Sequence, residues 1–455
     1  MPLGSCQTRH PMVAPADSEP APLRSLPYVN GLLVGEFASS AGSAMALLGI
    51  AYLSYDDSGS VLHTVLVSAA YSLPMALFGM YAGRLSQRVS RRKILLTSYT
   101  CKIAIYLALA ALAAAGSLKV PGLMISSVLA GVVAAFTSPA WMEYERDLLP
   151  ADRIAEANGA FGSVAAAAGI AGALAGGALM GVIGVWSVFL VDALSYLPFL
   201  WVVARAKVAE QRVESTAHIT LRATRDYLRA NRPLWQAFGR IAMLSLLVAP
   251  VAQLLPAIAA NVGRSQSTLG ILTAVFGVGA MSVAWVIARL QKRFDSQRII
   301  DLSFLATALV LCGFGLLGDP LDAPVLWVLI VAALIPLGLL LTLAQSVIAA
   351  IVQVRVDPEM EGPVFALYAI VYTVVAPIGG IALGLVADAQ GVWVALSVAG
   401  VAMLILTLVL AVVLRTGHHD GSAPGAGPHH PARLRMHHLQ SGVFPVAHEH
   451  RPRRA

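Results

Sequence analysis

The chain has 455 residues, of which 58% are hydrophobic and only 12% are charged, and its mean hydropathy is +0.75. A soluble domain carries about a quarter charged residues, so this composition excludes a water-soluble globular protein and indicates one that crosses a membrane several times. The net charge of +7 would suggest a nucleic-acid partner in a soluble protein. Here the basic residues lie in short loops between apolar segments, so membrane topology explains the positive charge and we expect no nucleic-acid partner.

Twelve apolar segments follow one another, each close to the roughly 20 residues that cross a bilayer as a helix. The first is longer than the core of a signal peptide, about 7–15 residues, so we expect it to be a retained membrane helix. We therefore predict an all-α membrane protein, with twelve transmembrane helices in two pseudo-symmetric six-helix bundles. The predicted spans are 31–53, 63–83, 93–115, 121–142, 157–179, 182–204, 237–258, 266–289, 299–317, 324–348, 362–385 and 391–414.

Polar stretches set the predicted domain limits. Residues 1–27 are rich in Pro, Ser and Ala and are predicted to be a disordered tail. The two bundles take residues 28–205 and 237–415, with a cytoplasmic linker at 206–236. Within the linker, Leu221 to Arg232 intersperses apolar side chains with arginines. This pattern suits an amphipathic helix on the inner membrane surface, and equally a solvated linker helix.

The C-terminal tail, 416–455, is rich in His, Pro and Arg and contains eight of the eleven histidines. Clustered histidines can bind a transition metal, which leaves metal-dependent regulation open. Pro and Gly are frequent in this tail, however, and no acidic or cysteine ligands are interleaved at regular spacing. We therefore predict a disordered tail and no metal site.

Basic residues predict the orientation. With the N-terminus inside, nineteen Lys and Arg residues fall in the inner loops, against only Lys119 and Arg264 in the outer loops. Such an excess marks the cytoplasmic side, so we predict that both termini are cytoplasmic.

The connection between the second and third spans, Gly83 to Lys93, reads GRLSQRVSRRK. It resembles the loop between helices 2 and 3 of major facilitator superfamily transporters, whose motif runs Gly-x-Leu-Ala-Asp-Arg-x-Gly-Arg-Lys. Gln87 stands where the family has Asp, and Ser90 where it has the second Gly. The residues that match are Gly83, Leu85, Arg88, Arg91, Arg92 and Lys93.

The resemblance implies a conformational latch at this loop. In the family the Asp caps a helix of the opposite half and stabilises the outward-open state. Gln87 offers no carboxylate to a helix N-terminus, so we expect a weaker latch or one made differently. The resemblance also implies that acids at the end of the fourth span, Glu143, Glu145 and Asp147, meet Arg88 or Arg91 when the cytoplasmic side closes.

The fifth span contains small residues at regular spacing. Gly159, Ala168, Gly172-Ala173 and Gly176-Gly177 resemble the family's antiporter motif, with Ala at two of its positions. That motif is associated with proton-coupled exporters. Ordinary small-residue helix packing is the alternative interpretation.

Stretches along nearly the whole membrane region resemble the enterobactin-exporter and macrolide-efflux branch of the superfamily. They specify the fold and the branch far better than the substrate. They are SSAGSAMALLGIAYL, YSLPMALFGMYAGRL, LLPADRIAEANG, DYLRANRPLWQAF, LLPAIAANVGRSQSTLGILTAVFGVGA, DPEMEGPVFALY and PIGGIALGLVADAQG.

Ionisable residues at membrane depth are costly, so each needs a partner or a task. Glu36 in the first span is a candidate proton-coupling residue, although it lies close enough to the span's start to reach cytoplasmic water. Lys102 and Asp192 each lie about nine residues into their spans, which places both near mid-membrane at about 1.5 Å per residue. We expect a structural ion pair between them, with a proton relay as the alternative.

By analogy with the fold, polar and aromatic residues of the cavity-lining spans are expected to contact the substrate. Arg240 is the candidate for an anionic substrate group in the second half. The cavity candidates are Ser39, Ser43, Trp141, Arg240, Gln253 and Gln345.

We predict a proton-coupled exporter of a small organic molecule (a drug, antibiotic, siderophore or secondary metabolite) in a bacterial plasma membrane, acting as a monomer without a cofactor. No Walker A glycine loop is present, so direct use of ATP is not expected. An uptake permease of the same fold is the main alternative. A membrane enzyme is a second alternative, but the sequence contains no GxSxG or HExxH motif that would support it. A sensor that signals through the histidine-rich tail is the third possibility.

Overall fold

The structure is a computed structural model that describes residues 28–149, 153–206, 221–262, 266–316, 323–357 and 360–416. Within these ranges, twelve helical spans are long and apolar enough to cross a membrane, which confirms the all-α fold with twelve transmembrane helices. The helices are α1 (Val29–Ser58), α2 (Val61–Arg88), α3 (Arg91–Ala114), α4 (Val120–Leu148), α5 (Ile154–Val182), α6 (Trp186–Ser195), α7 (Leu197–Arg205), α8 (Leu221–Ala230), α9 (Arg232–Leu247), α10 (Val251–Val262), α11 (Gln266–Met281), α12 (Val283–Gln291), α13 (Ser296–Leu316), α14 (Ala323–Arg355), α15 (Glu361–Gln390) and α16 (Val392–Thr416).

Three spans are made of two helices each. The sixth span divides into α6 and α7 at Tyr196, the seventh into α9 and α10, and the eighth into α11 and α12 at Ser282. Pro250 lies in the break of the seventh span, and Pro198 follows the break of the sixth. Proline has no N–H to donate to the preceding turn, so a helix breaks readily at such positions.

The helices extend beyond the predicted apolar spans. The second predicted span ends at residue 83 and the third begins at residue 93, but α2 continues to Arg88 and α3 begins at Arg91. The connection between α2 and α3 is therefore only Val89 and Ser90, and the arginines of the stretch from Gly83 to Lys93 belong to the two helices. Apolar windows end where charges begin, whereas a helix can continue through Arg and Gln, which are good helix formers.

The linker contains the expected helix, α8. Its Arg222, Arg225 and Arg229 are exposed, whereas Thr224 and Leu228 are buried. The buried face packs against the second half, and the Tyr227 hydroxyl, 3.0 Å from a carboxylate oxygen of Asp357, joins α8 to the end of α14. The amphipathic character is therefore present, while a place on the membrane surface stays a prediction.

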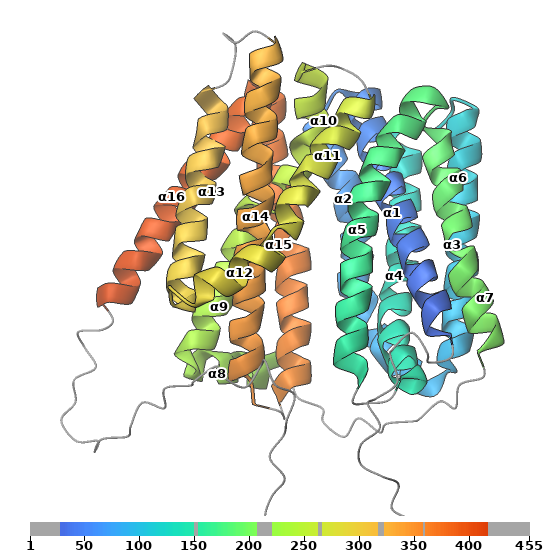
Figure 1. Cartoon of the computed structure of the whole chain (residues 1–455), viewed down its shortest axis with the longest axis horizontal. Coiled ribbons are helices and arrows are strands. Elements are labelled where there is room, and N and C mark those ends of the chain that lie inside the picture. The colour runs from blue at the N-terminus through green and yellow to red at the C-terminus, as the bar shows by residue number, and fades with distance from the viewer. Residues whose placement is uncertain are drawn as a thin grey trace, which may run out of the picture. The chain divides into compact units, whose positions relative to one another are not determined.

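Two groups of helices make up the membrane region, α1–α7 from the first half and α9–α16 from the second (Figure 1). The halves meet where α5 packs on α11 and α2 packs on α15. Among the described residues, those up to Leu408 form one compact unit, which contains both halves except the end of α16, and residues 409–416 belong to a second. The predicted tails before residue 28 and after Thr416, and most of the linker (207–220), lie outside the described residues, so those domain limits stay predictions.

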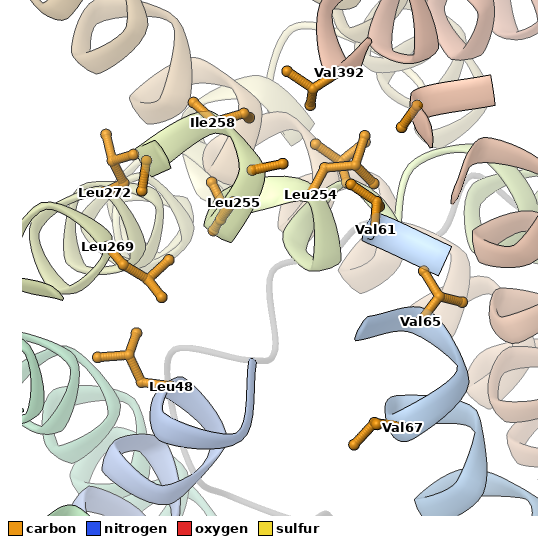
Figure 2. Close-up of a cluster of buried hydrophobic side chains, with 14 of the residues drawn as sticks. Leu48, Val61, Val65, Val67, Leu254, Leu255, Ile258, Leu269, Leu272 and Val392 are labelled. Carbon is orange, nitrogen blue, oxygen red and sulfur yellow. The ribbon is translucent and has the colours of Figure 1, made fainter. Parts of the chain in front are cut away.

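The buried side chains form three clusters, and only one of these three draws on both halves. The shared cluster lies at the end of the bundle where α2 begins and α15 ends, which we call the Asp388 end. At the opposite end, the Arg91 end, each half has its own cluster, with residues 29–203 in one and 228–403 in the other. The shared cluster, part of which Figure 2 shows, joins Leu48, Val61 and Val65 of the first half to Leu254, Leu255, Ile258, Leu269 and Val392 of the second.

Candidate functional site

The first half encloses a cavity of about 450 Å³ between α1, α2, α3, α4 and α6, with the beginning of α10 as its wall from the second half. Its lining is mostly apolar and aromatic, with hydroxyls and one charged group, Lys102. Such a lining is typical of sites that bind small organic molecules. The polar and aromatic lining residues are Ser43, Thr64, Ser68, Tyr71, Ser72, Lys102, Tyr106, Ser126, Ser127, Tyr196 and Gln253.

A second cavity of about 400 Å³ lies closer to the Arg91 end. Three residues line both cavities, namely Ser43, Lys102 and Tyr196, so these side chains form the wall between the two spaces. The other lining residues of the second cavity are Glu36, Ser39, Ser40, Tyr99, Thr137, Ser138, Trp141, Ala165 and Phe199.

Lys102 and Asp192 do not form the expected ion pair, since no oxygen of Asp192 lies within 4 Å of the Lys102 ammonium. The Lys102 nitrogen lies over the Tyr196 ring, 4.9 Å from its centre, a distance at which a cation is attracted to the ring face. Counting residues predicted that the two side chains lie at a similar level of the bundle, but this alone does not say which neighbour a side chain faces.

Asp192 is instead completely buried behind the wall. The Tyr196 hydroxyl lies 2.9 Å from Ser43 Oγ, which donates to Asp192 Oδ1 over 3.4 Å; Ser195 Oγ also lies 3.4 Å from Oδ1. The other carboxylate oxygen, Oδ2, has no hydrogen-bond partner among the described residues. Hydrogen bonds therefore connect Asp192, Ser43 and Tyr196, and the Tyr196 ring contacts Lys102 at the wall shared by both cavities.

Glu36 is half-buried in the wall of the second cavity, where Ser40 donates a 2.7 Å hydrogen bond to its carboxylate. Ser39, Ser43 and Trp141 line this same cavity, and Gln253 lines the first. Four of the six cavity candidates and two of the three coupling candidates, Glu36 and Lys102, thus line these cavities.

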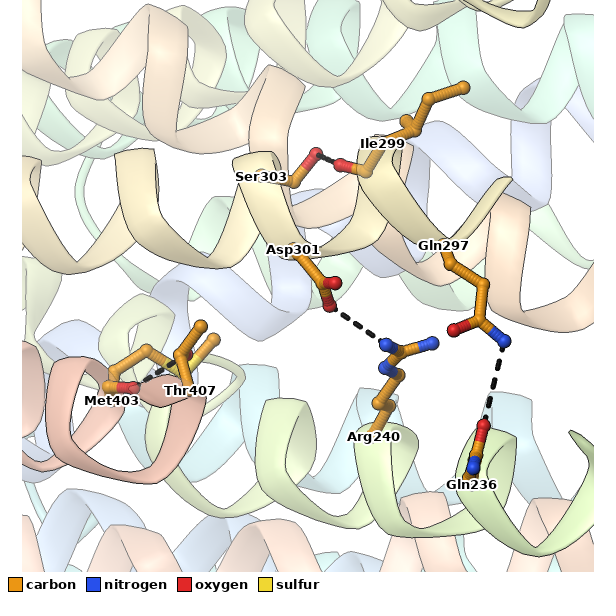
Figure 3. A network of polar contacts seen from close by, with 8 residues as sticks. All are labelled: Gln236, Arg240, Gln297, Ile299, Asp301, Ser303, Met403 and Thr407. Carbon is orange, nitrogen blue, oxygen red and sulfur yellow. Dashed lines mark hydrogen bonds and ion pairs between the residues drawn. The ribbon is translucent and has the colours of Figure 1, made fainter. Parts of the chain in front are cut away.

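Arg240 and Gln345 line neither of these cavities. Arg240 is 1% exposed, and one of its guanidinium nitrogens lies 2.8 Å from a carboxylate oxygen of Asp301 on α13 (Figure 3). Gln345 contacts Tyr372 within the second half. Arg240 is thus paired with a carboxylate of its own chain in this structure, and its role toward an anionic substrate stays a prediction.

At the Arg91 end of the bundle, Arg91 pairs with two acids of α4. Its Nε donates to Glu143 over 2.8 Å, and a second nitrogen donates to Asp147, which joins α3 to α4 inside the first half. Of the three acids expected there, Glu145 is not bound to Arg91; it is buried, and its Oε1 has no hydrogen-bond partner among the described residues. Arg92 donates to the backbone carbonyls of Val203 and Ala204 on α7.

The structure does not describe the side chains of Gln87 and Arg88 or the surroundings of Gly83. The role of these residues in a latch therefore stays a prediction. The pair that is described, Arg91 with α4, lies within one half.

The small residues of α5 serve two different contacts. A Cβ at Gly172 would meet the backbone of Ala41 on α1, and one at Gly176 would lie 3.2 Å from Met45, also on α1. A Cβ at Gly177 would lie 2.8 Å from the Cα of Gly270 on α11, so this glycine lets the two halves approach closely. Gly159 has open space around it and is not a packing residue.

Sequence reasoning missed two acids that cap helices at the Asp388 end. Asp57 accepts from the Val120 backbone N–H at the start of α4 over 3.1 Å, and its 2.6 Å hydrogen bond from Lys119 raises the pKa of that lysine. Asp388, near the end of α15, accepts from the first turn of α2. An Asp at the boundary of an apolar span was the available signal, but the helix that each one caps is not apparent from the sequence.

Comparison with known proteins identifies the fold. Residues 18–447 match the family described as transmembrane secretion effector, a group of the major facilitator type. None of the curated proteins compared with the chain matches it in sequence.

Solved transporters share this fold at low sequence identity. A bacterial homologue of the human lysosomal transporter Spinster, in an inward-facing and unoccupied conformation, matches with a TM-score of 0.66 at 14% identity, over 88% of this chain and 100% of that one. A bacterial homologue of the iron transporter ferroportin, in an inward-facing state, gives 0.69 at 13% identity, over 84% and 97%. The nucleoside transporter NupG gives 0.67 at 12% identity, over 86% and 100%.

Proposed function

The chain belongs to the transmembrane secretion effector family of major facilitator transporters, and from this premise we propose that it exports a small organic molecule in exchange for protons. Family and fold indicate a transporter rather than an enzyme. The coupling ion, the direction of transport and the substrate are the parts that we propose.

The observation that carries proton coupling is the wall between the two cavities. Asp192 is completely buried and has an unpartnered carboxylate oxygen, and Ser43 and Tyr196 connect it to Lys102, which lines both cavities. An ionisable group inside a membrane bundle is costly to maintain and typically marks an ion or proton pathway. In our proposal Asp192 takes up and releases the transported proton, and Glu36 exchanges it with water in the second cavity.

Alternating access is supported by the unequal ends of the bundle. The halves share one apolar core at the Asp388 end and have separate cores at the Arg91 end. The predicted orientation makes the Arg91 end cytoplasmic, so this arrangement corresponds to an inward-facing state. Two of the structural neighbours were also solved inward-facing. We place the protein in a bacterial plasma membrane, with both termini cytoplasmic.

Export is favoured over uptake by two features. The family's description is that of a secretion effector, and the small residues of α5 resemble the motif of proton-coupled exporters. The sequence stretches that resemble enterobactin exporters and macrolide-efflux proteins suggest a siderophore, antibiotic or related metabolite as substrate. An uptake permease of the same fold for a small metabolite is the alternative.

The test begins with a sensitivity panel of antibiotics and siderophores, applied to a bacterial host with and without the protein. A compound to which the protein gives resistance is then offered to inverted membrane vesicles. Energised vesicles with the native protein should accumulate it, and a protonophore should abolish the accumulation. Accumulation by right-side-out vesicles alone would establish uptake and contradict the proposal.

A further inference from the structure

The beginning of α2 and the end of α15 share one carboxylate, that of Asp388. Its Oδ1 accepts from the Val61 backbone N–H over 2.7 Å, and its Oδ2 accepts from the Ser60 hydroxyl over 2.5 Å and from the Leu62 N–H over 3.4 Å. These groups belong to opposite halves, and Val61 and Asp388 are 327 residues apart.

The chemistry of this contact is that of a helix cap. The first N–H groups of a helix have no partner within it, and an acid near that end also interacts favourably with the helix dipole. Ser60 caps α2 locally, because its Oγ accepts from the His63 N–H over 3.2 Å. Asp388 completes the cap from outside, so the first turn of α2 is satisfied only while α15 stays close.

The helix backbones approach closely beside this cap. A Cβ at Gly384, one turn before Asp388, would lie 2.9 Å from the Cα of Leu62, and one at Gly380 would lie 2.8 Å from Val65. Residues 380, 384 and 388 repeat every four positions and therefore lie on one face of α15, which is the face toward α2.

The same two helices are separated past the middle of α2, toward the Arg91 end. A cavity of about 240 Å³ lies between them there, lined by Met75, Ala76 and Gly79 of α2, Ala135 of α4, and Ala366, Ala369, Ile370 and Thr373 of α15. The α2–α15 pair is thus joined at one end of the membrane and parted at the other.

We propose that Asp388 is a gating residue, whose carboxylate holds α2 against α15 and keeps the transporter closed at the Asp388 end. This inference rests on the proposed transport function only in requiring that the halves move; it is independent of direction, coupling ion and substrate. Switching to the opposite state breaks the three contacts and exposes both the carboxylate and the first turn of α2 to water. The acid thereby sets the balance between the two states without touching the substrate.

A simple structural cap is the competing explanation, and the chain contains a matched control for it. Asp57 caps α4 in the same manner, with its carboxylate 3.1 Å from the Val120 nitrogen, but both helices belong to the first half. Removing that carboxylate should weaken a helix end without loosening the halves.

The experiment measures access to the shared core in purified protein. Cys6, Cys101 and Cys312 are replaced by Ser or Ala, and Leu255→Cys introduces a reporter at a position that is 3% exposed in the described state. Labelling by a hydrophilic maleimide then reports opening at the Asp388 end. We expect Asp388→Asn to raise the labelling rate at least threefold and Asp57→Asn to leave it unchanged. Equal rates in Asp388→Asn and the parent, or an equal rise in Asp57→Asn, would overturn the proposal.

A second variant covers the case in which Asp388→Asn does not fold. Val61→Pro removes the N–H that donates to Asp388 while keeping every charge. Proline is well tolerated at the first position of a helix, and the extended backbone of Ser60 (φ −120°, ψ 125°) is compatible with a following proline. Val61→Pro should also raise the labelling rate, and an unchanged rate would count against the gate.

Discussion

The ammonium nitrogen of Lys102 lies 4.9 Å from the centre of the Tyr196 ring, while the hydroxyl of that same tyrosine lies 2.9 Å from Ser43, the residue that donates to Asp192. A cation and an acid of the membrane interior are thus joined through a tyrosine and a serine instead of through a direct ion pair. This arrangement leaves the acid free to change its protonation state without breaking a salt bridge.

Asp192→Asn should separate function from stability. The substitution removes a buried carboxylate that has an unpartnered oxygen, and burying an unpaired charge is destabilising. We expect the melting temperature in detergent to be unchanged or higher, while proton-driven transport falls at least tenfold. Both quantities are measured on the same preparation, by thermal unfolding and by uptake into inverted vesicles.

The matched control is Asp226→Asn, which removes an exposed acid paired with Arg225 over 3.0 Å on α8. It should change neither quantity. A clear loss of stability in Asp192→Asn with transport retained would show that the carboxylate is structural.

Glu36→Gln should reduce transport driven by a pH gradient and leave substrate binding nearly intact. Glutamine keeps the acceptor for the 2.7 Å hydrogen bond from Ser40 but cannot bind and release a proton. Ser40→Ala, which removes only that hydrogen bond, is the control and should retain transport. If efflux by Glu36→Gln follows the pH gradient as the native protein does, Glu36 is not a coupling residue.

The sequence predicted the twelve spans because hydrophobic length is a local property, and the rise per residue predicted that Lys102 and Asp192 lie at a similar level of the bundle. It could not predict what each charge faces. Lys102 was expected to meet Asp192 and meets Tyr196, and Arg240 was expected to meet substrate and meets Asp301. Rotation of a helix about its axis and the packing of its neighbours decide such contacts, and neither is encoded in the spacing of residues along one helix.

Asp388 illustrates the same limit over a greater distance. It lies three residues beyond the predicted span 362–385 and no partner is predicted for it, although its partners lie at the start of the second helix of the other half. Conversely, the glycines of α5 were found from their spacing alone, because the need for small side chains between packed helices leaves a periodic pattern. The structure then showed that Gly177 contacts α11 and that Gly159 contacts nothing within 4 Å of its missing Cβ.

Gly177→Ala and Gly159→Ala should therefore have opposite effects on stability. Ala in place of Gly within a helix generally stabilises by about 0.5–1 kcal/mol, and the open surroundings of Gly159 allow this gain. At Gly177 the new methyl group would lie 2.8 Å from the Cα of Gly270, so α5 and α11 must separate. Such overpacking costs about 1–3 kcal/mol.

The measurement is thermal unfolding of the two variants beside the native protein in one detergent. Gly177→Ala should also slow transport, because it disturbs a contact between the halves. Equal melting temperatures for both variants would mean that the α5–α11 contact is looser than the structure indicates.

Arg91→Gln should destabilise the first half strongly. The side chain is 7% exposed and pairs with both Glu143 and Asp147, the latter 5% exposed, so the substitution removes the cation that these two partly buried carboxylates share. Breaking a buried ion pair from one side costs about 3–5 kcal/mol. Arg225→Gln breaks an exposed pair, for which a change of at most about 1 kcal/mol is expected. Comparable melting temperatures for these two variants would contradict a structural role for Arg91.

Gln87→Asp should shift the protein toward the state that is open at the Asp388 end. In related transporters an Asp at this position caps a helix of the opposite half, and a carboxylate interacts more favourably with a helix N-terminus than an amide does. This chain has its carboxylate at Asp388 instead, which favours closure at that end. Adding an acid at residue 87 and removing the one at residue 388 should therefore act in the same direction.

The Leu255→Cys reporter measures both changes on one scale. We expect Gln87→Asp to raise the maleimide labelling rate, and the double variant with Asp388→Asn to raise it by about the product of the two single effects. Residue 87 lies at the end of α2, whereas Asp388 contacts the beginning of α2. Distant sites that share no partner usually contribute additively to a free-energy difference. Gln87→Glu is the control, because its longer side chain carries the same charge. A rise in labelling with both variants would indicate a general effect of charge, and a rise with Gln87→Asp alone would indicate a helix cap. A labelling rate that Gln87→Asp does not change would mean that the carboxylate at the Arg91 end has no helix to cap, and that Asp388 alone sets the balance between the two states.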